Sequence, residues 1–192
     1  LFARTLARQV AQALDAVPGG EVLEFGPGSG ALAAELLAEL DTLGCAPARY
    51  AILDLSADLQ QRQREAIAAR VPHLIERVEW LAQLPESLSG VAIANEVLDA
   101  VSVRRFCVLD GGLAEQYVAA AADGLTLVQG PPQDGRLASR VAGLDLPVGY
   151  ASEVNLAAEA WVRSVCERLH AGLLLLIDYG YARAEYYHPQ RV

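Results

Sequence analysis

Residues 24–30 read Glu-Phe-Gly-Pro-Gly-Ser-Gly, and this stretch decides the fold. It closes a short apolar run, Glu21–Phe25, and it precedes Ala31–Leu43, in which leucines recur with helical spacing. Glycines permit a tight turn and let a ligand lie against bare backbone, while the start of a helix offers unpaired N–H groups. The stretch therefore predicts a strand, a ligand-binding loop and a helix in succession.

The spacing of these glycines differs from two common phosphate-binding loops. A G-x-G-x-x-G fingerprint would need a glycine at Ala31, three residues after Gly28, whereas the third glycine is Gly30. A Walker A loop needs a lysine, and all 15 basic residues of the chain are arginines. An ordinary glycine-rich turn remains the alternative, although the acid at Glu24 and the strand–loop–helix context favour a binding loop.

Continuous apolar runs alternate with helical stretches along the chain. The predicted strands are Glu21–Phe25, Tyr50–Leu55, Arg77–Leu81, Val91–Ala94 and Leu173–Ile177. The predicted helices are Leu1–Val17, Ala31–Leu43, Ser56–Arg70 with Ser56 as N-cap, and Ser152–His170. Apolar strands without alternation are typical of a parallel sheet that is covered on both faces. We therefore predict a doubly wound, Rossmann-like α/β fold in a single domain, residues 1–192.

One region interrupts this alternation. Between residues 103 and 130, three short β-type runs are separated by Asp110-Gly111-Gly112 and Asp123-Gly124, and Asp-Gly between such runs is a hairpin signal. We expect an antiparallel insertion here, between the fourth and fifth strands of the parallel sheet.

Polar and aromatic residues follow the second and third strands. Asp54 lies where doubly wound folds place an acid that accepts hydrogen bonds from ribose hydroxyls, although a helix-capping or solvated acid is the alternative. Leu55 follows it. Trp80 and Leu81 end the third strand, where an adenine ring would lie, but a single tryptophan is more often a core residue.

The fourth and fifth strands also end in polar residues. Asn95, Glu96 and Asp99 follow the fourth strand, and Asp178 follows the fifth. Because the carboxyl ends of parallel strands share one edge of the sheet, these side chains are expected at the ligand-binding edge. Acids that begin a helix would explain the first group, and a strand-end turn would explain Asp178. The functional hypothesis is that Glu96 and Asp99, with Asp178 in reserve, hold a cationic substrate.

Composition excludes several classes of function. The chain has 192 residues, a net charge of −9 and a 53% hydrophobic content. The acidic total argues against a nucleic-acid partner, and no apolar run has the roughly 18 residues that membrane insertion needs. The three cysteines and three histidines lack metal-ligand spacing, so we expect no metal site and a reducing, cytoplasmic environment. The chain contains no methionine, and we expect it to be part of a longer protein.

The glycine loop resembles motif I of class I methyltransferases that use S-adenosylmethionine. Together with LDLSADLQQRQ, ANEVLDAVSVRRF, ASEVN and LLLLIDYGYARAEYYHPQR, it resembles the MidA-type family along nearly the whole chain. That family includes a mitochondrial assembly factor of respiratory complex I, which methylates an arginine. The resemblance implies a class I methyltransferase fold and S-adenosylmethionine as cofactor. It also implies segments missing at both ends, because such a sheet usually has seven strands.

The resemblance also implies roles for individual residues. Asn95, Glu96 and Asp99 match the family's N-E-x-x-D-A segment near the methyl donor, and Asp54 stands where the family more often has Glu. The cofactor-binding set would be Glu24, Gly26, Pro27, Gly28, Gly30, Asp54, Leu55, Trp80, Leu81 and Asn95. The implied partner is a protein with an arginine acceptor that becomes symmetric dimethylarginine, in the bacterial cytoplasm or, for eukaryotic relatives, the mitochondrial matrix.

Three function classes stay open at this point. The first is the methyltransferase, and the second is an assembly or binding protein that keeps the cofactor fold with little catalysis. The third, a nucleotide-cofactor oxidoreductase, is disfavoured by the glycine spacing. The acidic composition and the antiparallel insertion are compatible with a homodimer.

Overall fold

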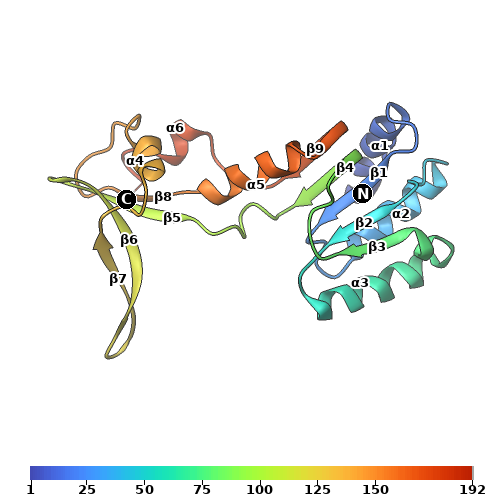
Figure 1. The fold of residues 1–192 in the computed structure, drawn as a ribbon, viewed down its shortest axis with the longest axis horizontal. Helices are drawn as coiled ribbons and strands as arrows, with labels where there is room; N and C mark the ends of the chain where they lie inside the picture. Colours follow the sequence, from blue (N-terminus) through green and yellow to red (C-terminus); the bar gives the residue numbers. More distant parts are fainter. Residues whose placement is uncertain (192) are drawn as a thin grey trace. The chain divides into compact units, whose positions relative to one another are not determined.

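A computed structural model describes residues 1–191 of the chain (Figure 1). The described residues group into two compact units. Unit 1 contains Leu1–Asp99 and Val162–Asp178, and unit 2 contains Ala100–Trp161 and the described residues from Tyr179 onward. The sequence predicts a single domain with an insertion, and these two units are the compact parts into which the described residues divide.

Unit 1 is built on a parallel sheet. Its strands are β1 (Glu21–Phe25), β2 (Tyr50–Leu53), β3 (Val78–Leu81), β4 (Leu88–Asn95) and β9 (Leu169–Ile177), in the order β3-β2-β1-β4-β9. All four neighbouring pairs are parallel, and the first and central strand, β1, pairs with both β2 and β4. The predicted α/β class and parallel sheet are confirmed, with longer fourth and fifth strands than expected.

Helices cover this sheet and build the core of unit 1. They are α1 (Phe2–Asp15), α2 (Ala31–Thr42), α3 (Ala57–Arg70) and the short 3-10 helix η1 (Pro72–Arg77). Leu36 and Leu40 of α2 pack with Val22 of β1 and Ile93 of β4 in one buried cluster. The predicted cap of α3 is confirmed, because the Ser56 hydroxyl accepts a hydrogen bond from the backbone N–H of Leu59 at 3.3 Å.

Unit 2 contains an antiparallel sheet with more strands than expected. Its strands are β5 (Arg104–Leu109), β6 (Gly112–Ala121), β7 (Gly124–Gly130) and β8 (Ala151–Val154), in the order β7-β6-β5-β8. The helices α4 (Gly135–Val141) and α6 (Arg183–Tyr186) also belong to this unit. Three of the four strands lie within the expected insertion at residues 103–130, and β8 follows later in the chain.

The predicted helix Ser152–His170 is wrong at both ends. Its first residues form β8, in which Ser152 is opposite Phe106 and Val154 is opposite Arg104 of β5. Helix α5 (Leu156–Cys166) begins only afterwards, where the Asn155 side chain accepts a hydrogen bond from the N–H of Ala158 at 2.9 Å. Burial of Val154 beside Phe106 stabilises the strand, because this contact outweighs local helix propensity.

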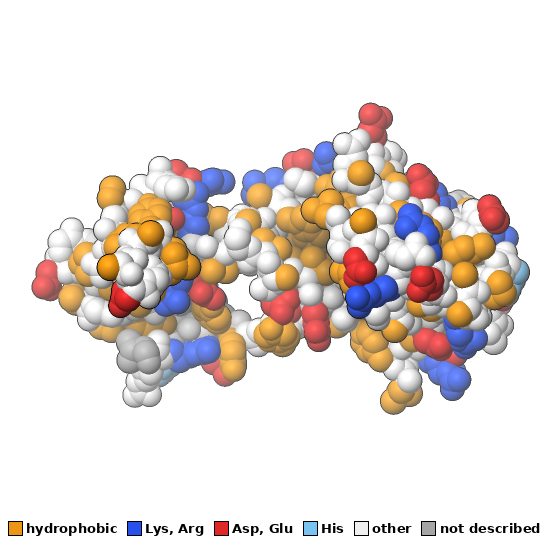
Figure 2. Space-filling model, turned by 90° about the horizontal axis from the view of Figure 1, so that it is seen from below, with side chains coloured by type: hydrophobic (Ala, Val, Ile, Leu, Met, Phe, Trp, Pro, Cys, Tyr) orange, Lys and Arg blue, Asp and Glu red, His pale blue; other side chains and the backbone are white. Residues whose placement is uncertain are grey.

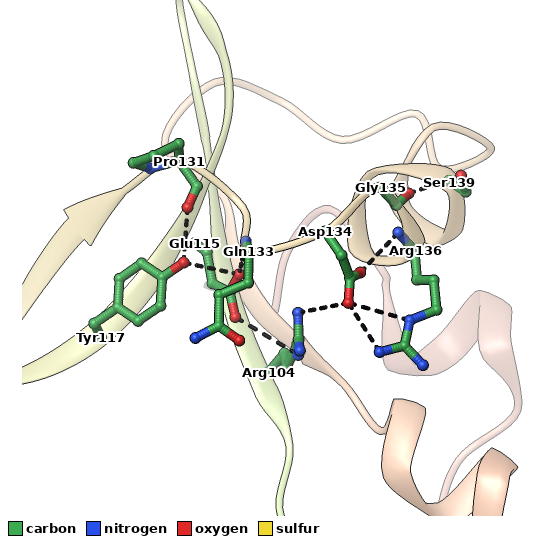
Figure 3. Close-up of polar contacts among 9 residues, drawn as sticks. All are labelled: Arg104, Glu115, Tyr117, Pro131, Gln133, Asp134, Gly135, Arg136 and Ser139. Atoms are coloured by element: carbon green, nitrogen blue, oxygen red, sulfur yellow. Dashed lines mark hydrogen bonds and ion pairs between the residues drawn. The ribbon is translucent and has the colours of Figure 1, made fainter.

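A polar network ties the sheet of unit 2 to the start of α4 (Figure 3). The buried Glu115 carboxylate accepts hydrogen bonds from the Tyr117 hydroxyl at 3.0 Å and from the Gln133 N–H at 2.8 Å. Arg104 lies 3.8 Å from Glu115 and 3.4 Å from Asp134, whose side chain caps α4. The guanidinium therefore bridges two carboxylates and compensates the burial of Glu115.

Candidate functional site at the glycine loop

The glycine loop combines a left-handed backbone with open space in front of it. The φ angles are 51° at Gly26, 56° at Gly28 and 82° at Gly30, a region that side chains with a Cβ rarely adopt. A Cβ on Gly28 would meet no atom within 4 Å, and one on Gly26 would meet only the Val97 side chain at 3.8 Å. The backbone of both residues is therefore bare toward the space that a ligand would occupy.

A pocket of about 350 Å³ opens at this loop. Its volume falls within the usual range of small-molecule sites. The lining residues come from the loop, the start of α2 and the end of β4, and they are Glu24, Gly26, Pro27, Gly28, Ser29, Leu32, Asn95 and Glu96. The structure thus brings two regions that lie far apart in sequence to one edge of the parallel sheet, as the sequence predicted.

Glu24 is buried and belongs to this lining. The Tyr50 hydroxyl of β2 donates a hydrogen bond to its Oε2 at 2.5 Å. Burial penalises the charged carboxylate and raises the pKa of Glu24 to about 7, although the bond from Tyr50 acts in the opposite direction. The same burial, reinforced by the neighbouring carboxylate, raises the pKa of Tyr50 above its ordinary range. The pocket therefore contains an acid that can change its charge near neutral pH.

The segment after β4 is held in an unusual conformation. Glu96 has a φ of 51° without being glycine, and its N–H donates to the carbonyl of Ile177 at 2.8 Å. Asp178 Oδ2 accepts hydrogen bonds from the N–H groups of Leu98 at 2.9 Å and Asp99 at 3.2 Å. Backbone strain of this kind is concentrated at functional sites. Asp178 thus holds the turn that presents Glu96, whereas Glu96 itself lines the pocket.

Asp54 is buried and its carboxylate is held from two sides. Oδ1 accepts from the Ser56 N–H at 2.9 Å, and Oδ2 accepts from the Gln63 side-chain amide at 2.7 Å. The acid is therefore not the N-cap of α3, a role that Ser56 fills. Its neighbour Leu55 is 84% exposed.

The sequence left open whether Trp80 is a core residue or lies against an adenine ring, and its contacts have features of both. Its ring packs partly against the core of unit 1, and its Nε1–H donates to Gln63 Oε1 at 2.9 Å. The guanidinium carbon of Arg64 lies 4.2 Å from the ring centroid. Asp54, Leu55, Trp80 and Leu81 are not among the described residues that line the pocket at the glycine loop.

Two further residues belong to this region although the sequence did not predict them, Tyr50 and Gln63. Both are completely buried and both bond to expected site residues. A signal existed for Gln63, because it lies four residues before the buried Ile67 on the same face of α3, where an apolar residue is the norm. In the part of the chain that the structure describes, no group of three potential metal ligands is found.

The fold and the pocket define a class of protein: an α/β protein with a parallel sheet and a pocket of small-molecule size at the carboxyl edge of that sheet. A family model described as "Putative S-adenosyl-L-methionine-dependent methyltransferase" matches residues 5–192. The chain belongs to this family. A search of curated proteins found no match.

Two solved structures from Burkholderia thailandensis are similar to the chain. Each has 47% sequence identity and a TM-score of 0.93, and each match covers 99% of this chain. One is described as an uncharacterized protein, and the other as a "likely methyl transferase" bound to S-adenosyl-homocysteine. The matches cover 51% and 49% of those chains, so this chain spans about half of their length.

The family and the ligand of the second Burkholderia structure confirm the predicted cofactor, S-adenosylmethionine. They also agree with the expected class I fold. The individual cofactor and catalytic residues remain predictions, as does the nature of the acceptor.

Proposed function

We propose that this protein is an S-adenosylmethionine-dependent methyltransferase and that its acceptor is an arginine side chain of a protein, modified to symmetric dimethylarginine. One observation carries the proposal. The bare backbone of Gly26 and Gly28 opens onto a pocket whose lining residues include two acids, Glu24 and Glu96. Family membership supports the cofactor, and the resemblance to the MidA-type family supports the arginine acceptor.

The charges of the pocket fit a positively charged cofactor better than one that carries phosphates. Among the described lining residues there are two acids and no Lys, Arg or His. Where these acids are ionised they would repel a pyrophosphate, whereas a sulfonium cation would be attracted to them. When bound, the cofactor supplies a methyl group activated by a positively charged sulfur atom.

The acids also suit a cationic acceptor. A guanidinium group keeps its charge at every physiological pH, so its approach to a second cation needs nearby negative charge. Glu96 lines the pocket, and Asp99 follows in the turn that Asp178 holds. We assign Glu96 to the acceptor nitrogen, where its carboxylate accepts a hydrogen bond, offsets the charge and takes the proton that the nitrogen loses when it gains the methyl group. Holding the acceptor in near-attack geometry can lower the barrier by roughly 7–11 kcal/mol.

The surface is compatible with a protein acceptor. Figure 2 shows acidic and basic side chains interspersed on the face in view, without a continuous basic patch on that face. None of the helices within residues 1–191 is both long enough and apolar enough to cross a membrane.

From the resemblance to the MidA-type family, we also propose that the methylated protein takes part in the assembly of a respiratory complex.

The test combines binding with methyl transfer. Calorimetry with S-adenosylhomocysteine measures cofactor binding, and transfer of tritiated methyl to an arginine-containing peptide measures activity. A matched peptide with lysine at the same position reports on the acceptor. We expect Glu96→Gln to retain binding and to lose transfer, whereas Glu86→Gln, which removes an exposed acid away from the lining, should retain both.

Each result has a separate meaning. Wild-type protein that binds no S-adenosylhomocysteine would contradict the methyltransferase itself. Binding without transfer to any peptide or lysate protein would favour the assembly-protein alternative. Label in the lysine peptide alone would refute arginine as the acceptor, and wild-type rates in Glu96→Gln would remove Glu96 from the mechanism.

A further inference from the structure

Gln63 is a completely buried polar residue in the middle of α3, and three parts of unit 1 bond to its side chain. Nε2 donates to the carbonyl of Gly28 at 2.9 Å and to Asp54 Oδ2 at 2.7 Å. Oε1 accepts from Trp80 Nε1 at 2.9 Å. The three partners belong to the glycine loop, the end of β2 and the end of β3.

The chemistry of the partners fixes the orientation of this amide. Two oxygen acceptors face one end, and a single N–H donor faces the other. The reversed amide would place its oxygen against two oxygens and its nitrogen against the indole N–H, which satisfies none of them. Both amide hydrogens are used, so Gln63 cannot give up one partner without leaving a buried group unpaired.

The glycine loop also lies directly against Gln63. A Cβ on Gly30 would lie 2.7 Å from Gln63 Cα, so the backbone of α3 passes as close to the loop as a glycine allows. The loop and α3 are therefore joined by a close backbone contact and by the bond to Gly28.

We infer that Gln63 is a positioning residue that holds the Asp54 carboxylate ready for a ribose diol and couples it to the glycine loop. This inference rests on the proposed function, because it takes S-adenosylmethionine as the ligand. A carboxylate has about four lone-pair sites. Ser56 and Gln63 occupy one on each oxygen of Asp54, which leaves one site on each oxygen to accept from the two ribose hydroxyls.

A purely structural role predicts a different behaviour. If Gln63 only filled space in the core, its replacement would weaken S-adenosylhomocysteine and its ribose-modified analogues equally. If Gln63 positions Asp54, its replacement should weaken ligands that have both ribose hydroxyls more than ligands that lack one. The ratio of two affinities therefore separates the two roles, because general destabilisation cancels in it.

The experiment measures the affinities of S-adenosylhomocysteine and its 2′-deoxyribose analogue by calorimetry. Wild-type protein should prefer the ribose ligand. Gln63→Leu, which keeps the approximate volume but removes the three bonds, should lower this preference by about tenfold. Gln61→Leu is the matched control, because Gln61 lies on the exposed side of the same helix, where its side-chain amide donates to Glu65 at 2.8 Å, so this variant should keep the wild-type preference.

Two further variants keep the inference testable if Gln63→Leu folds poorly. Gln63→Glu keeps the shape but places a carboxylate against Asp54, so it should lose the preference at neutral pH and recover part of it on acidification, when the new acid can donate. The single variant Asp54→Asn should lose the preference for the ribose ligand. The double variant with Gln63→Leu should show little further loss, because both substitutions act on the same contact.

The outcomes separate this inference from the proposed function. Equal weakening of both ligands by the Gln63 variants, or an unchanged preference in Asp54→Asn, would overturn the inference and leave the methyltransferase intact. Wild-type protein that binds neither ligand would overturn both.

Discussion

At the scale of single residues, the glycines of the loop carry two different constraints. Gly28 and Gly30 both have positive φ angles, but only Gly30 is confined by neighbouring atoms. A Cβ on Gly28 would project into open space at the pocket, whereas one on Gly30 would meet the backbone of α3. One position is therefore kept bare for a ligand and the other for the fold.

Alanine substitutions should separate these constraints. Gly28→Ala should lower the free energy of unfolding by about 1–2 kcal/mol through the left-handed backbone, and it should weaken S-adenosylhomocysteine binding by about tenfold or more. Gly30→Ala should lower the free energy of unfolding by about 1–3 kcal/mol more than Gly28→Ala does, because its methyl group overpacks against Gln63. Urea unfolding and calorimetry measure both quantities.

Gly44→Ala provides the matched control. Gly44 has a φ of 71° and open space around its Cβ position, but it does not line the pocket. Its substitution should cost as much stability as Gly28→Ala and leave ligand binding unchanged. Equal losses of affinity in both variants would show that backbone strain, rather than occupation of the pocket, accounts for the effect.

At the scale of elements, the burial of the Glu24 carboxyl between neighbouring strands makes the stability of the sheet sensitive to pH. Glu24 of β1 accepts from Tyr50 of β2, and burial raises the pKa of Glu24 from its ordinary 4.5 to about 7. The folded protein therefore keeps this proton over a range in which the unfolded chain has released it. The contribution of the Glu24 proton to the free energy of unfolding is fully present below pH 4.5, and it is lost as the pH rises from about 4.5 to about 7.

Glu24→Gln should remove this pH dependence. The amide cannot ionise, and its oxygen can still accept from the Tyr50 hydroxyl. Between pH 4.5 and pH 7, wild type should lose roughly 3 kcal/mol of its free energy of unfolding relative to the variant. Urea unfolding followed by tryptophan fluorescence in a Trp161→Phe background reports on unit 1 through Trp80.

The exposed Glu86 serves as the comparison for that experiment. Glu86→Gln should follow the wild-type pH profile. If the profile of Glu24→Gln is also parallel to that of wild type, the Glu24 carboxyl does not titrate between these values in the folded protein.

At the scale of the whole molecule, the pocket belongs to one of the two compact units. All its described lining residues lie in unit 1, as do Asp54, Gln63 and Trp80. Unit 2 has a separate buried core around Phe106 and Tyr150, and its sheet continues through the exposed strand β7. Cofactor binding should therefore be a property of unit 1.

Hydrogen exchange measured by mass spectrometry checks this assignment. Saturating S-adenosylhomocysteine should slow exchange in peptides that cover residues 21–36 and 91–98, because a bound ligand stabilises the segments that contact it. Peptides from residues 112–130 should exchange at the same rate with and without ligand. Slower exchange in those peptides would show that ligand binding is coupled to unit 2.

Local patterns in the sequence were sufficient for the parallel sheet and the glycine loop. Continuous apolar runs indicate buried parallel strands, and three alternating glycines after a strand indicate a bare loop, because both signals depend on neighbouring residues only. These two signals also predicted that the loop lies close to Asn95 and Glu96, because parallel strands end at one edge of the sheet.

The residues that only the tertiary structure revealed depend on partners distant in the chain. Glu24 meets Tyr50 across 26 positions, and Gln63 meets Gly28 across 35. Residues 152–154 look helical locally but belong to β8, because β5 supplies hydrogen-bond partners and a buried surface for Val154. Local sequence thus determined where the pocket lies, while the contacts between strands and α3 decided the charge of its acid and the orientation of the carboxylate at Asp54.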